Sequence, residues 1–225
     1  MYNLDVLIKM IPLIARLKKG SHRDVAQAQD LVVREMAEML DTAVFHGGTA
    51  IWRCFKGNRF SEDIDVYLRK DTAKIEAFFK KLESLGFKIE KKKIGGNSIY
   101  SNLLLGRTEV RFEALFKSEK GSLKEYETAD GNLITLYCLT AEELVNEKVD
   151  TYLKRMKVRD LYDIFFLLRH VEKQAEVIAK IKYLLSNYKK PVDEKELKVL
   201  ILEGLVPSAE AMKEYIGVHL KRWEK

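Results

Sequence analysis

Two aspartates one residue apart stand out as candidate chemical groups in this 225-residue sequence. Asp63 and Asp65 lie in the segment DIDVYLR, which alternates with the two-residue period of a β-strand. Because successive strand side chains point to opposite faces, both carboxylates are expected on one face. Two carboxylates held this close repel each other unless a cation lies between them. Mg²⁺, which prefers oxygen ligands, is the cation that we expect there.

A Gly-Gly-Thr sequence precedes these aspartates, directly after the short apolar segment 43–46. Gly47, Gly48 and Thr49 open a segment of helical character over 49–56, for which Thr49 is the expected N-cap. Glycines let backbone N–H groups approach an anion, and a helix N-terminus is electropositive. A Gly-Gly turn or an Asp-x-Asp strand end is by itself more often merely structural. In this order, with Ser61 opening a Ser-x-Asp-x-Asp pattern, they favour a site for a nucleoside triphosphate.

A third carboxylate is available on the segment Glu109-Val110-Arg111-Phe112-Glu113. Its period-two pattern places Glu109, Arg111 and Glu113 on one face of a strand. If this strand lies beside the strand of Asp63 and Asp65, Glu113 reaches the same metal ion. A cross-strand ion pair involving Arg111 explains the pattern equally well.

A second group of charged residues lies in the C-terminal half. Asp160 and Asp163 are spaced to share one helix face, with Arg159 beside them, and Lys148 lies on the preceding helical segment. A cation here would neutralise triphosphate charge during transfer of a phosphorus centre. On spacing alone, a salt-bridge network between two helices is the favoured interpretation.

The elements that position these residues change in kind near residue 140. Helices are expected over 4–17, 25–40, 49–56 and 73–85, and strands over 43–46, 63–69, 87–94, 98–105, 108–116 and 133–139. A polar stretch, 117–132, precedes the last strand. Thr140 and Glu143 form a capping-box pattern, after which only helices are expected. The sequence therefore predicts an α+β protein, with an α/β domain over 1–139 and a helical domain over 140–225.

Composition limits the classes of function. With 40 Lys+Arg and 34 Asp+Glu the net charge is +6, a weak preference for polyanionic partners. Lys80, Lys81 and the lysines of 88–93 are candidate RNA contacts, although a solvated helix face and a lysine-guarded edge strand are the favoured explanation. The two cysteines lack metal-binding spacing, which favours a reducing cytoplasm. No apolar run approaches the roughly 18 residues of a membrane span, so no membrane partner is expected.

Two quoted segments together resemble a known family. The segments FHGGTAIWRCF…RFSEDIDVYL and EELVNEKVD…R…VRDLYDI are similar to the AbiEii/AbiGii-type nucleotidyltransferase toxins. This family belongs to the DNA polymerase β-like nucleotidyltransferase superfamily and occurs in type IV toxin–antitoxin and abortive-infection systems. The resemblance implies a polymerase β-like mixed sheet followed by a helical half. It also implies site roles: triphosphate binding by Gly47, Gly48 and Thr49, Mg²⁺ binding by Asp63 and Asp65 with support from Ser61, and a further motif of Lys148 with Asp160 or Asp163.

The activity implied by the resemblance is Mg²⁺-dependent transfer of a nucleotide from an NTP to an acceptor, which in characterised relatives includes tRNA 3′ ends. A neutralising antitoxin is the implied protein partner. Family members often carry Lys immediately before the Gly pair, whereas this chain has His46, and Arg53, Lys56 and Arg59 are candidates to replace that charge. Two alternatives are a non-catalytic nucleotide- or RNA-binding module on the same fold and a kinase-like phosphotransferase. Intact Asp63, Asp65 and Lys148 argue against the first, and release of NDP would distinguish the second.

Overall fold

The computed structural model describes residues 11–224 and divides the chain into two compact units. The first contains the chain up to Lys56 together with residues 60–138. The second contains residues 57–59 together with the chain from Leu139 onward. A short piece of the loop that precedes Asp63 therefore belongs to the helical unit.

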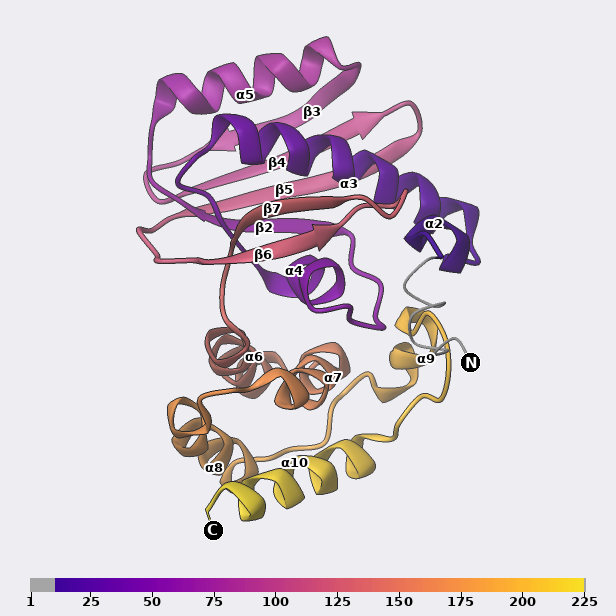
Figure 1. Ribbon diagram of the computed structural model, residues 1–225, viewed down its shortest axis with the longest axis vertical. Helices are drawn as coiled ribbons and strands as arrows, with labels where there is room; N and C mark the ends of the chain where they lie inside the picture. Colours follow the sequence, from indigo (N-terminus) through magenta and orange to yellow (C-terminus); the bar gives the residue numbers. More distant parts are fainter. Residues whose placement is uncertain (1–10, 225) are drawn as a thin grey trace, which may run out of the picture. The chain divides into compact units, whose positions relative to one another are not determined.

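A mixed seven-stranded sheet forms the centre of the first unit (Figure 1). The strand order is β3-β4-β5-β2-β1-β7-β6. The strands are β1 (Val44–His46), β2 (Asp63–Leu68), β3 (Phe87–Ile94), β4 (Ser98–Leu105), β5 (Thr108–Phe116), β6 (Ser122–Glu127) and β7 (Leu133–Cys138). Strand β2 pairs antiparallel with β1 and parallel with β5. The predicted Asp-x-Asp strand is thus central, flanked by the strands that carry His46 and Glu113.

Helices cover this sheet because its apolar residues must be buried. The helices of the unit are α2 (Leu13–Arg16), α3 (Gly20–Met39), α4 (Gly47–Cys54) and α5 (Thr72–Ser84). Helices α3 and α5 lie side by side, α3 over β5 and α5 over β3 (Figure 1). Phe78 and Phe79 of α5 pack on Phe112 of β5, and all three side chains are buried. These aromatic contacts hold β5 under the helices. Strand β4 lies between β5 and β3, and β2 lies on the other side of β5.

Three details of the first unit differ from the predictions. Strand β6 lies within the stretch predicted only as polar. Tyr126 is its one buried residue and the others are half-buried or exposed, so the strand lacks the apolar alternation that would have predicted it. Helix α3 begins at Gly20, earlier than the predicted start at 25. The helix predicted over 4–17 is represented in the described residues by α2, which begins directly after Pro12, whose ring favours a helix start. Residues 4–10 of that prediction lie outside the described residues.

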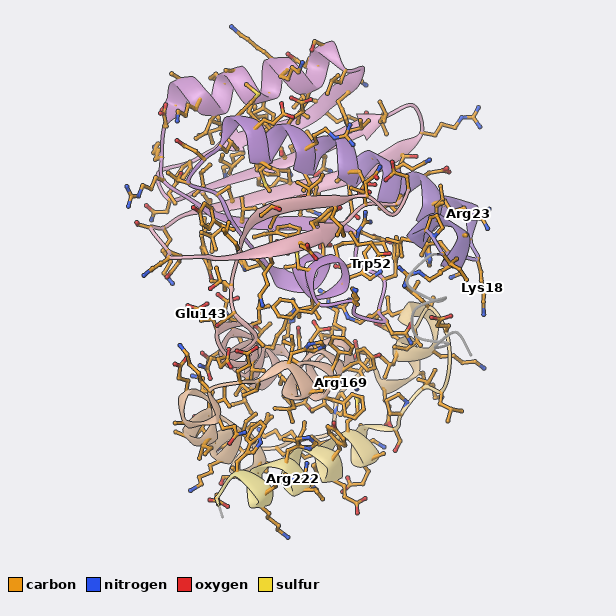
Figure 2. The ribbon with its side chains drawn as sticks, viewed as in Figure 1. Lys18, Arg23, Trp52, Glu143, Arg169 and Arg222 are labelled. Atoms are coloured by element: carbon orange, nitrogen blue, oxygen red, sulfur yellow. The ribbon has the colours of Figure 1, made fainter. Side chains whose placement is uncertain are left out.

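The second unit is helical. Its elements are α6 (Ala141–Arg155), α7 (Val158–Leu167), α8 (Ile178–Ser186), α9 (Leu197–Leu200) and α10 (Ala209–Trp223), with short 3₁₀ segments at Leu168–His170, Gln174–Glu176 and Glu194–Glu196. The predicted capping box is present at the start of α6: Glu143 N donates to Thr140 Oγ1 at 3.2 Å, and Thr140 N donates to Glu143 Oε2 at 2.8 Å. Figure 2 labels Glu143 on this helix. Helix α6 ends at Met156 in the left-handed conformation, with φ of 51°. None of the described helices is long and apolar enough to cross a lipid bilayer.

Candidate active site

Three carboxylates lie on one face of adjacent strands in the first unit. On β2, Asp63 and Asp65 are half-buried while Ile64 and Val66 are fully buried, as the alternation predicts. Because β2 and β5 run parallel, Asp65 is paired in register with Glu113. The residues predicted from separate segments therefore come together, and we call Asp63, Asp65, Glu113 and Arg111 the carboxylate edge.

Arg111 is the cation of this edge. It is in register with Asp63, and its Nη2 lies 3.1 Å from Asp63 Oδ1, while its Nη1 lies 3.6 Å from Glu113 Oε1. Although Asp63 Oδ1 is close to this guanidinium, it is buried and accepts no hydrogen bond within the described residues. The ion pair that the sequence allowed as an alternative is thus present, and it leaves one buried carboxylate oxygen without a hydrogen-bond donor.

Electrostatic repulsion acts on Glu113. Burial raises the pKa of its carboxyl, the negative charges of Asp65 and Asp63 raise it further, and Arg111 lowers it. The pKa of Glu113 therefore lies above its ordinary value. Burial is the largest cause of this rise, and the repulsion from Asp65 and Asp63 adds to it, so a cation bound beside these carboxylates would favour their charged forms.

Gly47 brings the start of α4 against the aspartates. Its φ is +76°, a left-handed conformation that favours glycine. A Cβ at this position would collide with Asp65 Oδ2 and lie 3.0 Å from Asp65 Cβ. A glycine is required here because both the conformation and the close approach exclude a side chain. Helix α4 begins at Gly47, so the first residue of the helix lies beside the carboxylate of Asp65, and the first-turn N–H groups have no acceptor inside the helix.

Thr49 and Gln29 hold this arrangement in place. Thr49 is fully buried, and its hydroxyl donates to the backbone carbonyl of Asp63 at 2.5 Å. The prediction that Thr49 is the N-cap is wrong, because α4 begins two residues earlier, at Gly47. The Thr49 side chain instead connects α4 to β2 through its hydrogen bond to Asp63. Gln29 of α3 donates from Nε2 to the carbonyls of Ser61 at 3.1 Å and Glu62 at 2.9 Å. The backbone leading into Asp63 is therefore anchored from two helices.

Arg53, Lys56 and Arg59 are the residues predicted to replace the positive charge of a lysine before Gly47. Arg53 is buried, pairs with Asp30 and donates from Nε to the carbonyl of Glu127 at 2.6 Å. Arg53 therefore stabilises the core and is a wrong candidate for the phosphate contact. Lys56 is exposed, and His46 stacks on Tyr67 with ring centroids 4.0 Å apart, on the face of the carboxylates.

A separate charged cluster occupies the second unit, where we define the Lys148 cluster as Arg59, Lys148, Arg155, Asp160 and Asp163. Asp163 is buried and receives two hydrogen bonds from Arg59, Nε to Oδ1 and Nη2 to Oδ2, both of 2.8 Å. Lys148 Nζ lies 2.8 Å from Asp163 Oδ2 and 3.6 Å from Asp160 Oδ1. The helices α6 and α7 thus join Lys148 to both aspartates, as the sequence predicts.

Arginines neutralise both carboxylates of this cluster. Arg155 donates to Asp160 Oδ2 at 2.7 Å and Oδ1 at 2.8 Å, so each aspartate accepts a bidentate pair of hydrogen bonds from its own arginine. Burial raises the pKa of Asp163, but the charges of Arg59 and Lys148 outweigh this effect and leave it below the ordinary value. Three cations and two carboxylates give the cluster a formal charge of +1. Because the arginines satisfy the carboxylates, the surplus charge is that of Lys148.

Arg159 is placed differently from its neighbours. It is exposed on the first turn of α7 and lines a surface pocket with Lys157 and Asp193. The structure therefore does not bring Arg159 to Lys148, although the two residues lie in the same unit. Its predicted contact with a nucleotide stays a prediction.

Comparison with known families decides the class of the protein. Residues 30–214 match the family described as nucleotidyl transferase AbiEii toxin, type IV toxin–antitoxin system. The chain belongs to this family. The resemblance and the enzyme class predicted from the sequence are thereby confirmed: the protein is an AbiEii-family nucleotidyltransferase of a toxin system.

Solved structures show the same fold for this AbiEii-family chain. JHP933 from Helicobacter pylori matches with a TM-score of 0.67 and 18% identity, covering 91% of this chain and 92% of that one. MenT4, a nucleotidyltransferase toxin from Mycobacterium tuberculosis, matches with a TM-score of 0.65 and 19% identity, covering 92% and 87%. No curated protein matches the sequence. The predicted α+β nucleotidyltransferase fold is confirmed.

Sequence reasoning missed the supporting roles of Gln29 and Arg59. Gln29 shares a helix face with the buried residues Ala26, Val32 and Val33, so a polar residue at apolar spacing was the available signal. Arg59 is separated from Asp163 by 104 positions in the sequence, and nothing in the local pattern pairs them. Such distant pairs can be recognised only once the fold is known.

Proposed function

We propose that this nucleotidyltransferase uses Mg²⁺ and a nucleoside triphosphate, and transfers the nucleotide to a hydroxyl of an RNA acceptor, with tRNA as the candidate that the family resemblance provides. The observation that carries the proposal is the carboxylate edge beside the Gly47 helix start. Acidic ligands and an electropositive helix terminus meet there, which suits a metal ion bound together with phosphate.

The residues of the carboxylate edge fit Mg²⁺. The buried Asp63 Oδ1 lacks a hydrogen bond among the described residues. Burial and the charges of Asp65 and Asp63 raise the pKa of Glu113, and a cation would relieve the part due to repulsion. Within residues 11–224, no group of three or more His, Cys, Asp and Glu side chains is arranged to hold a metal ion by itself. Mg²⁺ is commonly held by one or two carboxylates, with water and substrate phosphate completing its shell. We therefore assign Asp63 and Asp65 as ligands and keep Glu113 as a predicted third.

Bound Mg²⁺ would supply Lewis-acid stabilisation of charge on the triphosphate. The chain contributes orientation: the N–H groups at Gly48 and Thr49 would face phosphate oxygens at the start of α4. In the reaction, the acceptor hydroxyl oxygen bonds to the α-phosphorus as the bond to the β-phosphate bridging oxygen breaks, releasing pyrophosphate. A carboxylate of the edge would accept the hydroxyl proton.

Lys148 is proposed to bind phosphate from the second unit. Its ammonium contacts Asp163 through one donor, and the cluster's formal charge of +1 remains for an anionic ligand. Asp163, with both oxygens held by Arg59, positions the lysine and is not expected to exchange protons. Asp160 plays the same role with Arg155.

A protein partner and a cellular location complete the proposal. Membership of a toxin–antitoxin family implies an antitoxin that neutralises the enzyme. We propose the cytoplasm as the place of reaction, since both cysteines are free thiols, which suits a reducing compartment.

The test is product analysis with labelled nucleotides. Wild-type protein, Mg²⁺ and total tRNA are incubated with each α-³²P-NTP and, in parallel, with γ-³²P-NTP. We expect RNA to become labelled only from the α position, with pyrophosphate as the second product. Label from the γ position with release of NDP would contradict the proposal and show a phosphotransferase. RNA binding without any turnover would instead show a binding module.

A further inference from the structure

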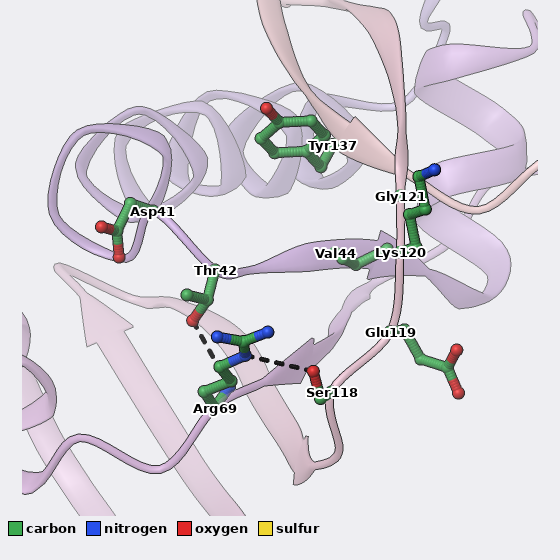
Figure 3. A pocket seen from close by; sticks show the side chains of 9 residues that line it. All are labelled: Asp41, Thr42, Val44, Arg69, Ser118, Glu119, Lys120, Gly121 and Tyr137. Carbon is green, nitrogen blue, oxygen red and sulfur yellow. Dashed lines mark hydrogen bonds between the residues drawn. The ribbon is translucent and has the colours of Figure 1, made fainter.

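A cavity of about 350 Å³ lies in the first unit, away from the carboxylate edge (Figure 3). Its floor is at the far end of β2, where Arg69 follows the strand, beside Thr42 and Val44 at the start of β1. The segment 118–121 and Tyr137 of β7 close the other side. Six strand residues at roughly 3.3 Å each separate Asp63 from Arg69, so the cavity is about 20 Å from Asp63. It is therefore a different site.

The charge of this cavity favours an anion. Both carboxylates in its lining are already paired: Asp41 with Lys74 Nζ at 2.9 Å, and Glu119 with Lys117. In the part of the chain that the structure describes, neither Arg69 nor Lys120 takes part in a salt bridge. With the acidic residues neutralised by their own lysines, two positive charges remain to attract a ligand.

Arg69 is held ready for such a ligand. Its Nε donates to Ser118 Oγ at 3.1 Å, and its backbone N–H points to Thr42 Oγ1 at 3.4 Å (Figure 3). The two terminal nitrogens of the guanidinium make no hydrogen bond within the described residues. A guanidinium fixed through Nε offers both of these nitrogens to phosphate oxygens with little further loss of side-chain freedom.

Tyr137 provides an aromatic wall. Its side chain is 46% exposed, and no hydrogen bond of its hydroxyl is found among the described residues. Gly121 keeps the segment that carries Lys120 against this wall, because a Cβ there would lie 2.8 Å from Tyr137 Cβ and 3.0 Å from Val44 Cγ1. An exposed aromatic ring next to unpaired cations is the combination that binds a base together with its phosphate.

We propose that this cavity, which we call the Arg69 pocket, binds a nucleotide, with a phosphate between Arg69 and Lys120 and the base against Tyr137. The nucleotide comes either from an RNA strand or from a free nucleoside triphosphate, and the two sources share this chemistry. Binding here is independent of turnover at the carboxylate edge, so it can be measured in a protein that lacks activity.

The test uses the full chain carrying Asp63→Asn and Asp65→Asn, which removes the proposed metal ligands and separates this site from the first. Three probes are titrated: a fluorescein-labelled single-stranded RNA, ATP and inorganic pyrophosphate. Arg69→Gln, Lys120→Gln and Tyr137→Leu are compared with Lys18→Gln, which removes an exposed lysine between α2 and α3. All four positions are at the surface, and circular dichroism checks that each variant folds.

We expect Arg69→Gln and Lys120→Gln each to weaken nucleotide binding about tenfold and to reduce its salt dependence. Tyr137→Leu should weaken nucleotide binding about tenfold through lost stacking while leaving pyrophosphate binding unchanged. A loss confined to RNA identifies a strand-binding site, and a loss confined to ATP identifies a free-nucleotide site. The proposal is overturned if no probe binds, if the three pocket variants behave like Lys18→Gln, or if Tyr137→Leu weakens pyrophosphate binding as much as it weakens nucleotide binding.

Discussion

The carboxylate edge and the Lys148 cluster contain the same kinds of side chain with opposite balance. In the edge, one arginine contacts two of the three carboxylates, Asp63 and Glu113, and a buried oxygen of Asp63 lacks a hydrogen bond among the described residues. In the cluster, each of two carboxylates has its own arginine, and Lys148 adds a further charge. The first arrangement calls for a cation and the second for an anion.

The two regions should also differ in whether a substitution changes activity or stability. Removing an acidic residue from the edge relieves repulsion, whereas removing Asp163 from the cluster leaves the buried cations Arg59 and Lys148 without that partner. Substitutions in the two regions should therefore differ in which property they change.

The largest effect is expected from the double variant Asp63→Asn/Asp65→Asn. Transfer of α-label to RNA should fall by about 10³-fold or more, because the metal that stabilises transition-state charge loses its ligands. The free energy of unfolding, measured in urea, should stay the same or rise. Retained activity, or a loss that is accompanied by unfolding, would remove the distinction between the two regions.

Asp163→Ala should act mainly on stability. Arg59 and Lys148 would remain buried without their carboxylate, so the free energy of unfolding should fall by about 3–5 kcal/mol. Asp150→Ala on α6 is the matched control, because Asp150 is exposed and its ion pair with Lys180 contributes little. Equal urea midpoints for the two variants would show that the cluster does not stabilise the helical unit.

Lys148→Gln should reduce activity about 100-fold with little change in stability. Both arginine–aspartate pairs survive this substitution, and only the surplus charge is lost. Lys154→Gln, an exposed lysine on the same helix, is the control that should retain activity. Steady-state kinetics and urea unfolding check both properties, and a large loss of stability would assign Lys148 a purely structural role.

Gly47→Ala should reduce activity about tenfold and stability by about 1–2 kcal/mol, because a side chain strains the left-handed backbone and displaces Asp65. Gly106→Ala is an informative control. Gly106 also has positive φ, 62°, but a Cβ there meets nothing within 4 Å. Both variants should lose stability, and only Gly47→Ala should lose activity. A similar loss of activity in both would argue against the close approach of Gly47 to Asp65.

Local patterns predicted much of the fold. Alternation identified β3, β4 and β5 with their bounds, and the Thr140 capping box located the start of α6. Strand β6 was not predicted because this edge strand buries only Tyr126 and so shows no apolar alternation. Thr49 was misassigned because its hydroxyl bonds to a strand that follows later in the chain, a contact that helix-capping rules do not include.

The candidate site was predictable only in part, because its residues come from separate segments. The aspartate pair is a local motif, and the face it presents follows from strand geometry. That β5 lies beside β2, and so brings Glu113 to Asp65, depends on packing among Phe78, Phe79 and Phe112. The pairing of Arg59 with Asp163 likewise depends on which unit holds residues 57–59.

The most direct test of this account measures nucleotide affinity by calorimetry with and without Mg²⁺ in wild type, Asp63→Asn/Asp65→Asn and Lys148→Gln. The account predicts Mg²⁺-dependent binding in wild type. It predicts loss of that dependence in the double aspartate variant, and weaker but still Mg²⁺-dependent binding in Lys148→Gln. Mg²⁺-dependent affinity that survives in the double aspartate variant would contradict the assignment of the carboxylate edge as the metal site.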